Sequence, residues 1–290
     1  MRTGARAARV ECRAMSDAPI ILVFDSGVGG LSVLAALRER LPGCDFLFAC
    51  DNAAFPYGTK AEAELVDRVD QVVGGLVRHE APELVVIACN SASTVALPRL
   101  REYLTQPVIG VVPAIKPAAV SSATKVIGLL GTPGTVNRPY TRQLIAEFAP
   151  DCKVIPLGST RLVEIAELAL RGTTPDATEL AGIITPLFAD PTLDTVVLAC
   201  THFPLLATEL AAAAPRPVRW IDSGDAIARR AASLLPGWRS GTDHGFRAHF
   251  TSPHGIRALY PALGQLGCRE IRIRDAQGVT HPAPAPFFQK

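Results

Sequence analysis

Two cysteines stand in matching sequence contexts. Cys89 ends the run LVVIA at 84–88, Cys200 ends the similar run TVVLA at 195–199, and a small polar residue follows each thiol. Short β-branched and aliphatic runs are typical of buried parallel strands, so each cysteine should lie where a strand gives way to a helix. There the helix dipole favours a thiolate, and free N–H groups favour a carboxylate ligand. The repeat therefore predicts two thiols that act from opposite sides of one site.

Simpler explanations exist for each candidate residue. A buried cysteine at a strand end is more often an apolar filler than a reactive group. Asp25 could be a helix N-cap, His202 a capping or core histidine, and Glu164 a solvated residue on an amphipathic helix. The duplication of the thiols favours chemistry. The position of His202 beside the second thiol does so too, because histidine is the usual general acid or base near neutral pH.

Composition excludes several classes of protein. The chain has 290 residues, 48% of them hydrophobic, which is enough for two domains of ordinary size. A net charge of +2 predicts no nucleic-acid partner. The seven cysteines show neither CxxC nor Cys/His ligand spacing, which argues against a disulfide framework or a metal site and favours the cytoplasm. No apolar run approaches the roughly 20 residues that span a bilayer, so no membrane contact is expected.

The N-terminus is basic and has no apolar core. Four arginines fall within the first 14 residues, but no hydrophobic stretch follows them, so this is not a secretory signal. We expect residues 1–18 to form a disordered tail, unless Met15 is the true start of the protein.

Strands and helices alternate along the rest of the first half. An apolar strand at 20–24 runs into the glycine-rich turn DSGVGG at 25–30, whose free N–H groups suit an anion. A strand at 45–50 leads to the loop FPYG at 55–58, and a helical pattern covers 62–78. This alternation predicts an α/β fold with mostly parallel sheets.

The pattern restarts after the segment VPAIKP at 112–117. A strand at 126–130, a turn at 131–135 and a helix at 136–148 follow, and a second Asp-Ser-Gly stands at 222–224. We therefore predict two similar, pseudo-symmetric α/β domains. Residues 19–113 with 224–290 would form the domain of Cys89, and 114–223 that of Cys200. Each domain would offer the carboxyl ends of its strands to an active site in the common cleft.

These motifs together resemble glutamate racemases. The matching segments are FDSGVGGL at 24–31, FPYG at 55–58, ACNSAS at 88–93, GLLGT at 128–132 and CTHFPLL at 200–206. They occur in the family's order and span residues 20 to about 235. The resemblance implies a homodimeric enzyme of two α/β domains that racemises glutamate without a cofactor and supplies D-glutamate for peptidoglycan.

Carried over residue by residue, the resemblance also implies the site. Cys89 and Cys200 match the two catalytic cysteines, and Asp25, His202 and Glu164 match side chains that assist them. The positions that match substrate contacts are Asp25, Ser26, Tyr57, Gly58, Asn90, Ser91, Thr201 and His202.

One part of the chain resembles a particular branch of the family. The segments at 112–117 and 157–159 are similar to those of members from Gram-negative bacteria. Some members of that branch depend on a UDP-linked peptidoglycan precursor, so UDP-MurNAc-L-alanine is a candidate activator. Ser91 replaces the threonine of many members but keeps the hydroxyl group.

The chemistry accounts for the residue types. Inverting an α-carbon requires proton removal on one face and proton return on the other, so two acid–base groups are the minimal solution. A thiol suits this task because its ordinary pKa of about 8.5 is readily adjusted. Hydroxyl and N–H groups at Ser26, Asn90, Ser91 and Thr201 would hold the substrate carboxylate. From the resemblance, Cys89 takes the proton of D-glutamate and Cys200 that of L-glutamate.

Three alternatives stay open. An aspartate racemase or another two-cysteine racemase would share these motifs, and a substrate panel would separate them. A pyridoxal-phosphate racemase is disfavoured, because none of the five lysines lies in a phosphate-binding context. A non-catalytic amino-acid binding module would not need both thiols together with Asp25 and His202.

Overall fold

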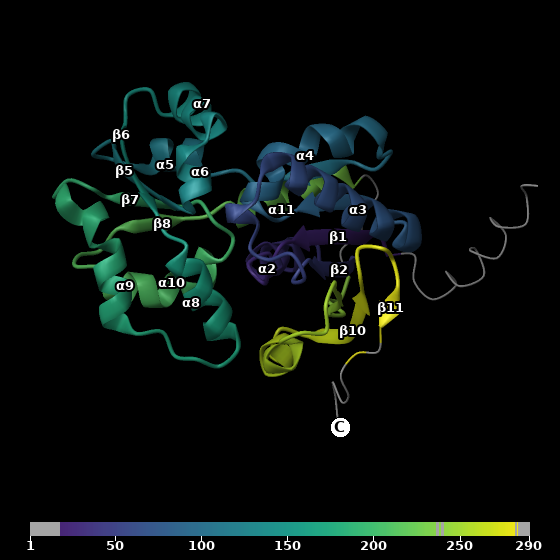
Figure 1. Cartoon of the computed structure of the whole chain (residues 1–290). Coiled ribbons are helices and arrows are strands. Elements are labelled where there is room, and N and C mark those ends of the chain that lie inside the picture. Colours follow the sequence, from purple (N-terminus) through teal and green to yellow (C-terminus); the bar gives the residue numbers. More distant parts are fainter. Residues whose placement is uncertain (1–17, 236–237, 239–240, 282, 284–290) are drawn as a thin grey trace, which may run out of the picture.

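The computed structural model describes residues 18–235, 238, 241–281 and 283. Two sheets, each with helices on both faces, form two lobes that lie side by side (Figure 1). Residues 1–17 of the predicted tail lie outside the described part of the chain. None of the described helices is both long and apolar enough to cross a membrane.

Sheet A, in the first lobe, has the strand order β11-β10-β9-β2-β1-β3-β4. Every neighbouring pair is parallel except β10 and β11. The strands are β1 (Ile20–Asp25), β2 (Asp45–Cys50), β3 (Leu84–Ile87), β4 (Val108–Gly110), β9 (Phe246–Phe250), β10 (Cys268–Arg274) and β11 (Thr280–His281). The segment after residue 240 therefore widens this sheet.

Alternation along the strands supplies sheet A with two cores. Ile21 and Val23 of β1 face one core, whereas Leu22 and Phe24 face the other. The first core is covered by α2 (Leu31–Arg40), α11 (Gly224–Leu234), η5 (Ile256–Leu259) and α12 (Tyr260–Gln265). The second core is covered by α3 (Glu62–Glu80) and α4 (Asn90–Tyr103). Between β2 and α3 lies the short helix η2 (Tyr57–Thr59).

Sheet B, in the second lobe, is fully parallel with the order β6-β5-β7-β8. Its strands are β5 (Val126–Gly131), β6 (Lys153–Gly158), β7 (Thr195–Leu198) and β8 (Arg219–Ile221). One face packs on α8 (Arg161–Leu170), α9 (Ala177–Ile184), η3 (Thr185–Ala189), η4 (Phe203–Leu206) and α10 (Ala207–Ala213). The other packs on α5 (Ile115–Ser121) and α7 (Pro139–Phe148).

The helix predicted at 136–148 is divided. The short helix α6 (Pro133–Asn137) ends before Arg138, which is extended with φ −68° and ψ 143°. A residue that precedes proline avoids the helical region, and Pro139 then begins α7 as its first residue.

The two lobes repeat one strand order. The order β2-β1-β3-β4 in sheet A corresponds to β6-β5-β7-β8 in sheet B, and the two thiols follow the equivalent strands β3 and β7. The two Asp-Ser-Gly turns are not equivalent, however, because Asp25 ends β1 whereas Asp222 follows β8. The counterpart of Asp25 is the turn after β5. The predicted two-lobed α/β fold is thus confirmed, and its symmetry lies in strand order rather than in the Asp-Ser-Gly pair.

Two connections join the lobes. One runs from β4 to α5, the other from β8 to α11, and the Ser223 hydroxyl donates to the Val112 carbonyl across them at 2.5 Å. The domain boundaries predicted after 113 and after 223 fall within these connections, and they remain a prediction.

Candidate active site

A cavity of about 290 Å³ lies between the lobes. It is reached by the carboxyl ends of β1, β3, β5 and β7 and by the loop around η2. All the residues predicted for the site line it: Asp25, Ser26, Tyr57, Gly58, Cys89, Asn90, Ser91, Glu164, Cys200, Thr201 and His202. The fold therefore brings these residues together, as parallel strands deliver their following turns to one edge.

Cys89 lies in a buried environment beside Ser26 and Asp25. Its sulfur is 3.7 Å from Ser26 Oγ, and Asp25 Oδ1 accepts the Ser26 N–H at 2.6 Å. Burial, with the Asp25 carboxylate as a smaller cause, raises the pKa of Cys89 well above the usual thiol value. Burial likewise raises the pKa of Asp25. Burial at this position therefore favours the protonated form of the Cys89 thiol.

Cys200 lies beside a histidine that a carboxylate holds in place. Its sulfur is 3.8 Å from Nδ1 of His202, and Nε2 of His202 is 2.9 Å from Glu167 Oε1. Burial lowers the pKa of His202, but the contacts with Cys200 and Glu167 outweigh it and hold that pKa well above the ordinary value. The result is an acid–base group within reach of the second sulfur.

Glu167 has further partners on both lobes. It accepts the Val28 N–H at 2.8 Å and an Arg171 N–H at 2.5 Å. Although burial raises the pKa of Glu167, the hydrogen bonds lower it to about 2, with that to His202 the largest of them. At neutral pH the carboxylate beside the imidazole is therefore charged.

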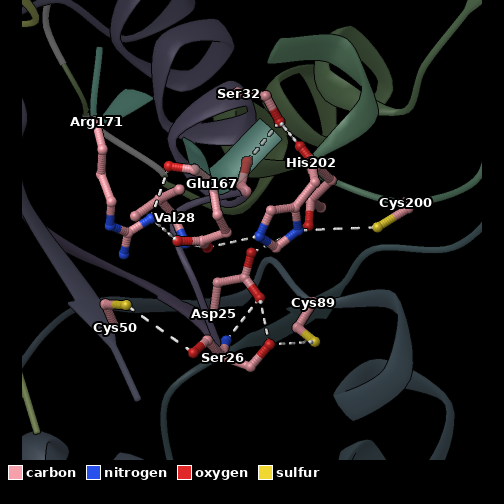
Figure 2. A network of polar contacts seen from close by, with 12 residues as sticks. Asp25, Ser26, Val28, Ser32, Cys50, Cys89, Glu167, Arg171, Cys200 and His202 are labelled. Atoms are coloured by element: carbon pink, nitrogen blue, oxygen red, sulfur yellow. Dashed lines mark hydrogen bonds and ion pairs between the residues drawn. The ribbon is translucent and has the colours of Figure 1, made fainter. Parts of the chain in front are cut away.

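Asp25 links the polar contacts around Cys89 with those around Cys200. Its Oδ2 accepts the Thr201 hydroxyl at 3.0 Å, and the Ser32 hydroxyl of the first lobe donates to the Thr201 carbonyl at 2.8 Å. Figure 2 shows Cys200 at the end of the branch through His202, Cys89 at the end of the branch through Ser26, and Asp25 between them. Each thiol thus has its own polar partners within one connected arrangement.

The glycine-rich turn after β1 permits this close approach. A Cβ on Gly29 would lie 2.7 Å from the His202 backbone nitrogen, and one on Gly27 would lie 2.9 Å from His202 Nε2. The sequence suggested that the N–H groups of this turn bind an anion. The anion at Val28 is the protein's own Glu167 carboxylate.

Glu164 and Tyr57 line the cavity but are engaged elsewhere. Glu164 is exposed and pairs with Arg161 at 2.9 Å, and no contact in the described part of the chain joins it to a thiol. The glutamate in the thiol network is Glu167, one turn further along α8. The Tyr57 hydroxyl donates to Asp51 at 2.6 Å, so it points away from the cavity's polar groups.

Several lining residues were not identified from the sequence. Thr132 and Thr135 belong to the turn after β5, and Thr160 precedes α8. The likeness of the 131–135 turn to the first glycine-rich turn was the available signal. Asn90 begins α4, and its buried Oδ1 has no hydrogen-bond partner within the described residues, which leaves it available to a ligand. No cluster of metal-ligating side chains occurs in the described ranges.

Comparison with known proteins is consistent with this geometry. Residues 30–231 match the family model described as Asp/Glu/Hydantoin racemase. Glutamate racemase of Pectobacterium carotovorum is 54% identical over 218 residues, which are 75% of this chain and 76% of that protein. Glutamate racemase of Salmonella typhimurium is 50% identical over 254 residues, covering 86% and 89%.

A solved structure is similar along nearly its whole length. Escherichia coli glutamate racemase, crystallised with L-glutamate and the activator UDP-MurNAc-Ala, has a TM-score of 0.83 and 46% identity, covering 88% of this chain and 97% of that one. Glutamate racemase RacE1 of Bacillus anthracis, at 27% identity, has a TM-score of 0.78 and covers 90% and 99%.

Proposed function

The chain belongs to the Asp/Glu/Hydantoin racemase family, and we propose that it interconverts L- and D-glutamate with two cysteines as its acid–base groups. One observation carries the proposal. Two thiols, one from each lobe, line a single cavity, and each has a separate set of polar partners.

In the proposed reaction, one sulfur takes the Cα proton, so a C–H bond breaks and an S–H bond forms. The electron pair stays on Cα, in conjugation with the α-carboxylate. The thiol on the other face then gives its proton to Cα, which inverts the centre. His202, oriented by Glu167, would exchange a proton with Cys200. Asp25 and Ser26 would assist proton transfer at Cys89.

The cavity supplies donors for two carboxylates. Asn90 and Ser91 form the first turn of α4, where free N–H groups suit the α-carboxylate. The hydroxyls of Ser26 and Thr201 line the same part of the cavity but donate to Asp25. The threonines Thr132, Thr135 and Thr160 add hydroxyls from the second lobe for the side-chain carboxylate. This set of donors from both lobes supports a dicarboxylic amino acid as substrate.

The family resemblance supports a proposal for the biological setting. D-Glutamate is a building block of peptidoglycan, so we assign the enzyme to cell-wall synthesis in the cytoplasm, working as a homodimer. We also propose UDP-MurNAc-L-alanine as an activator. The structure of the E. coli relative contains such an activator. The segment 112–117, which resembles the Gram-negative branch in which some members need an activator, runs from the inter-lobe connection into α5.

Circular dichroism of the amino acid tests the function directly. Purified protein is incubated with L-glutamate, D-glutamate, L-aspartate or D-aspartate, each with and without UDP-MurNAc-L-alanine. We expect the optical signal of both glutamate enantiomers to decay to zero and that of aspartate to persist. Decay only with the precursor would support the activator. Loss of the optical signal with aspartate but not with glutamate would identify aspartate as the substrate. No loss of signal with any of the amino acids would favour the binding-module alternative.

A further inference from the structure

Asp51 carries a fully satisfied carboxylate next to the active-site cavity. It follows β2, and its side chain is inaccessible to solvent. Oδ1 accepts hydrogen bonds from Arg68 Nη2 at 2.6 Å and from the Thr251 hydroxyl at 2.6 Å. Oδ2 accepts from Arg68 Nε at 2.7 Å and from the Tyr57 hydroxyl at 2.6 Å. Each oxygen thus has two donors, which is about the full capacity of a carboxylate.

This arrangement decides what Tyr57 can do. A phenol has one proton to donate, and that of Tyr57 is directed to Asp51. Burial, helped by the Asp51 charge, raises the pKa of Tyr57 far above its usual value, so the hydroxyl stays neutral. Tyr57 therefore lines the cavity but offers no hydroxyl proton to a substrate carboxylate.

The loop that carries Tyr57 reaches from the first lobe to the second. The Phe55 ring packs against the core of the second lobe and has its centroid 5.9 Å from that of the His202 ring. A Cβ on Gly134 would lie 3.1 Å from the Gly58 carbonyl oxygen. A displacement of this loop would therefore change both the wall of the cavity and the packing of His202.

The two residues that hold Asp51, Arg68 and Thr251, are distant from the loop in sequence and belong to regular elements or lie at their ends. Arg68 lies on α3, and Thr251 follows β9, the neighbour of β2 in sheet A. The Thr251 hydroxyl also accepts the Ala53 N–H at 3.1 Å, at the start of the same loop. Thr251 does not line the active-site cavity.

We propose that Asp51 is a positioning residue for the racemase site. Held by Arg68 and Thr251, its carboxylate fixes Tyr57 and with it the loop 55–58 that shapes the cavity and packs against His202. The Tyr57 hydroxyl acts through Asp51 and makes no bond to the substrate. This inference rests on the proposed function, because it concerns the reaction that the cavity supports.

A comparison of two variants that each lose one hydroxyl group tests the inference; Thr251→Val also removes the acceptor of the Ala53 N–H. Thr251→Val and Tyr57→Phe each remove one donor from Asp51 with almost no change in shape, but only Tyr57 lines the cavity. We expect each variant to lower kcat/KM for glutamate by about tenfold, because small displacements of positioning groups are costly. The double variant should lose much less than the product of the two effects, since both act through one carboxylate. Thr195→Val, a buried threonine at the far end of β7 from Cys200, serves as the matched control and should stay within twofold.

The outcomes separate the alternatives. Activity of Thr251→Val within twofold of the parent, with a loss for Tyr57→Phe, would mean that the tyrosine contacts substrate directly and would overturn the inference. Losses that multiply fully in the double variant would also overturn it. Glutamate affinity measured by calorimetry gives a second readout. If the parent binds glutamate without racemising it, the proposed function fails, and an unchanged affinity of Thr251→Val then overturns this inference as well. A weakened affinity supports it. A parent that neither racemises nor binds glutamate overturns both.

Discussion

Nε2 of His202 lies 2.9 Å from Oε1 of Glu167, and the opposite ring nitrogen faces the Cys200 sulfur. A buried carboxylate behind an imidazole fixes the orientation of the ring and favours its protonated form. Glu167 is itself held by Val28 of the first lobe, so the acid–base apparatus of Cys200 depends on both lobes.

The contact between His202 and Glu167 predicts that Glu167→Gln will lower kcat far more than Glu164→Gln. The amide cannot stabilise the imidazolium, so kcat should fall by on the order of a hundredfold, the usual scale of a general acid–base contribution. Glu164 lies on the same helix and lines the same cavity, but it is exposed and paired with Arg161. Its substitution should change kcat by less than about twofold, in keeping with a surface ion pair. Steady-state kinetics of both variants decide the point, and a larger loss in Glu164→Gln would restore the role that the family resemblance gave it.

The same carboxylate predicts a pH dependence of stability. The pKa of Glu167 is about 2 in the folded protein against 4.5 for the unperturbed group, so its ionised form stabilises the fold. That contribution is complete above about pH 4.5 and is lost as the pH falls toward 2. The difference in unfolding free energy between the parent and Glu167→Gln should therefore shrink over this range. Urea unfolding at a series of pH values measures it, and a difference that grows on acidification would contradict the assignment.

Gly29 should be intolerant of any side chain. A Cβ at this position would meet the backbone and ring of His202. Gly29→Ala should therefore displace the imidazole and lower kcat/KM by about a hundredfold. Gly182→Ala is the matched control, because Gly182 is an exposed residue of α9 with nothing within 4 Å of a built Cβ. It should leave activity unchanged and raise the unfolding free energy by about 0.5–1 kcal/mol. Equal activity in both variants would show that the turn containing Gly29 accommodates a side chain without displacing His202.

Much of the fold was predictable because local signals agree with the global arrangement. The apolar runs before Cys89 and Cys200 are too short and too rich in β-branched residues for helices, and they form the buried strands β3 and β7. Once the strands are parallel, the turns that follow them must meet at one edge, which brings Asp25 and Cys89 together.

The remaining features depend on contacts that no local pattern contains. Glu164 and Glu167 are one helical turn apart and lie on nearly the same face, so only the placement of α8 against the first lobe selects Glu167. The orientation of the Tyr57 hydroxyl depends on Asp51, and one of the other partners of Asp51, Thr251, is 200 residues away. The insertion of β9 beside β2 is likewise a long-range pairing.

The most direct test of the two-thiol mechanism follows the α-proton by NMR in D₂O with Cys89→Ala and Cys200→Ala. The parent should exchange the α-proton of both glutamate enantiomers and racemise them. Each variant should lose racemisation yet still exchange one enantiomer, which would be L-glutamate for Cys89→Ala and D-glutamate for Cys200→Ala. A single-thiol variant that interconverts the enantiomers at close to the parent rate would contradict the account.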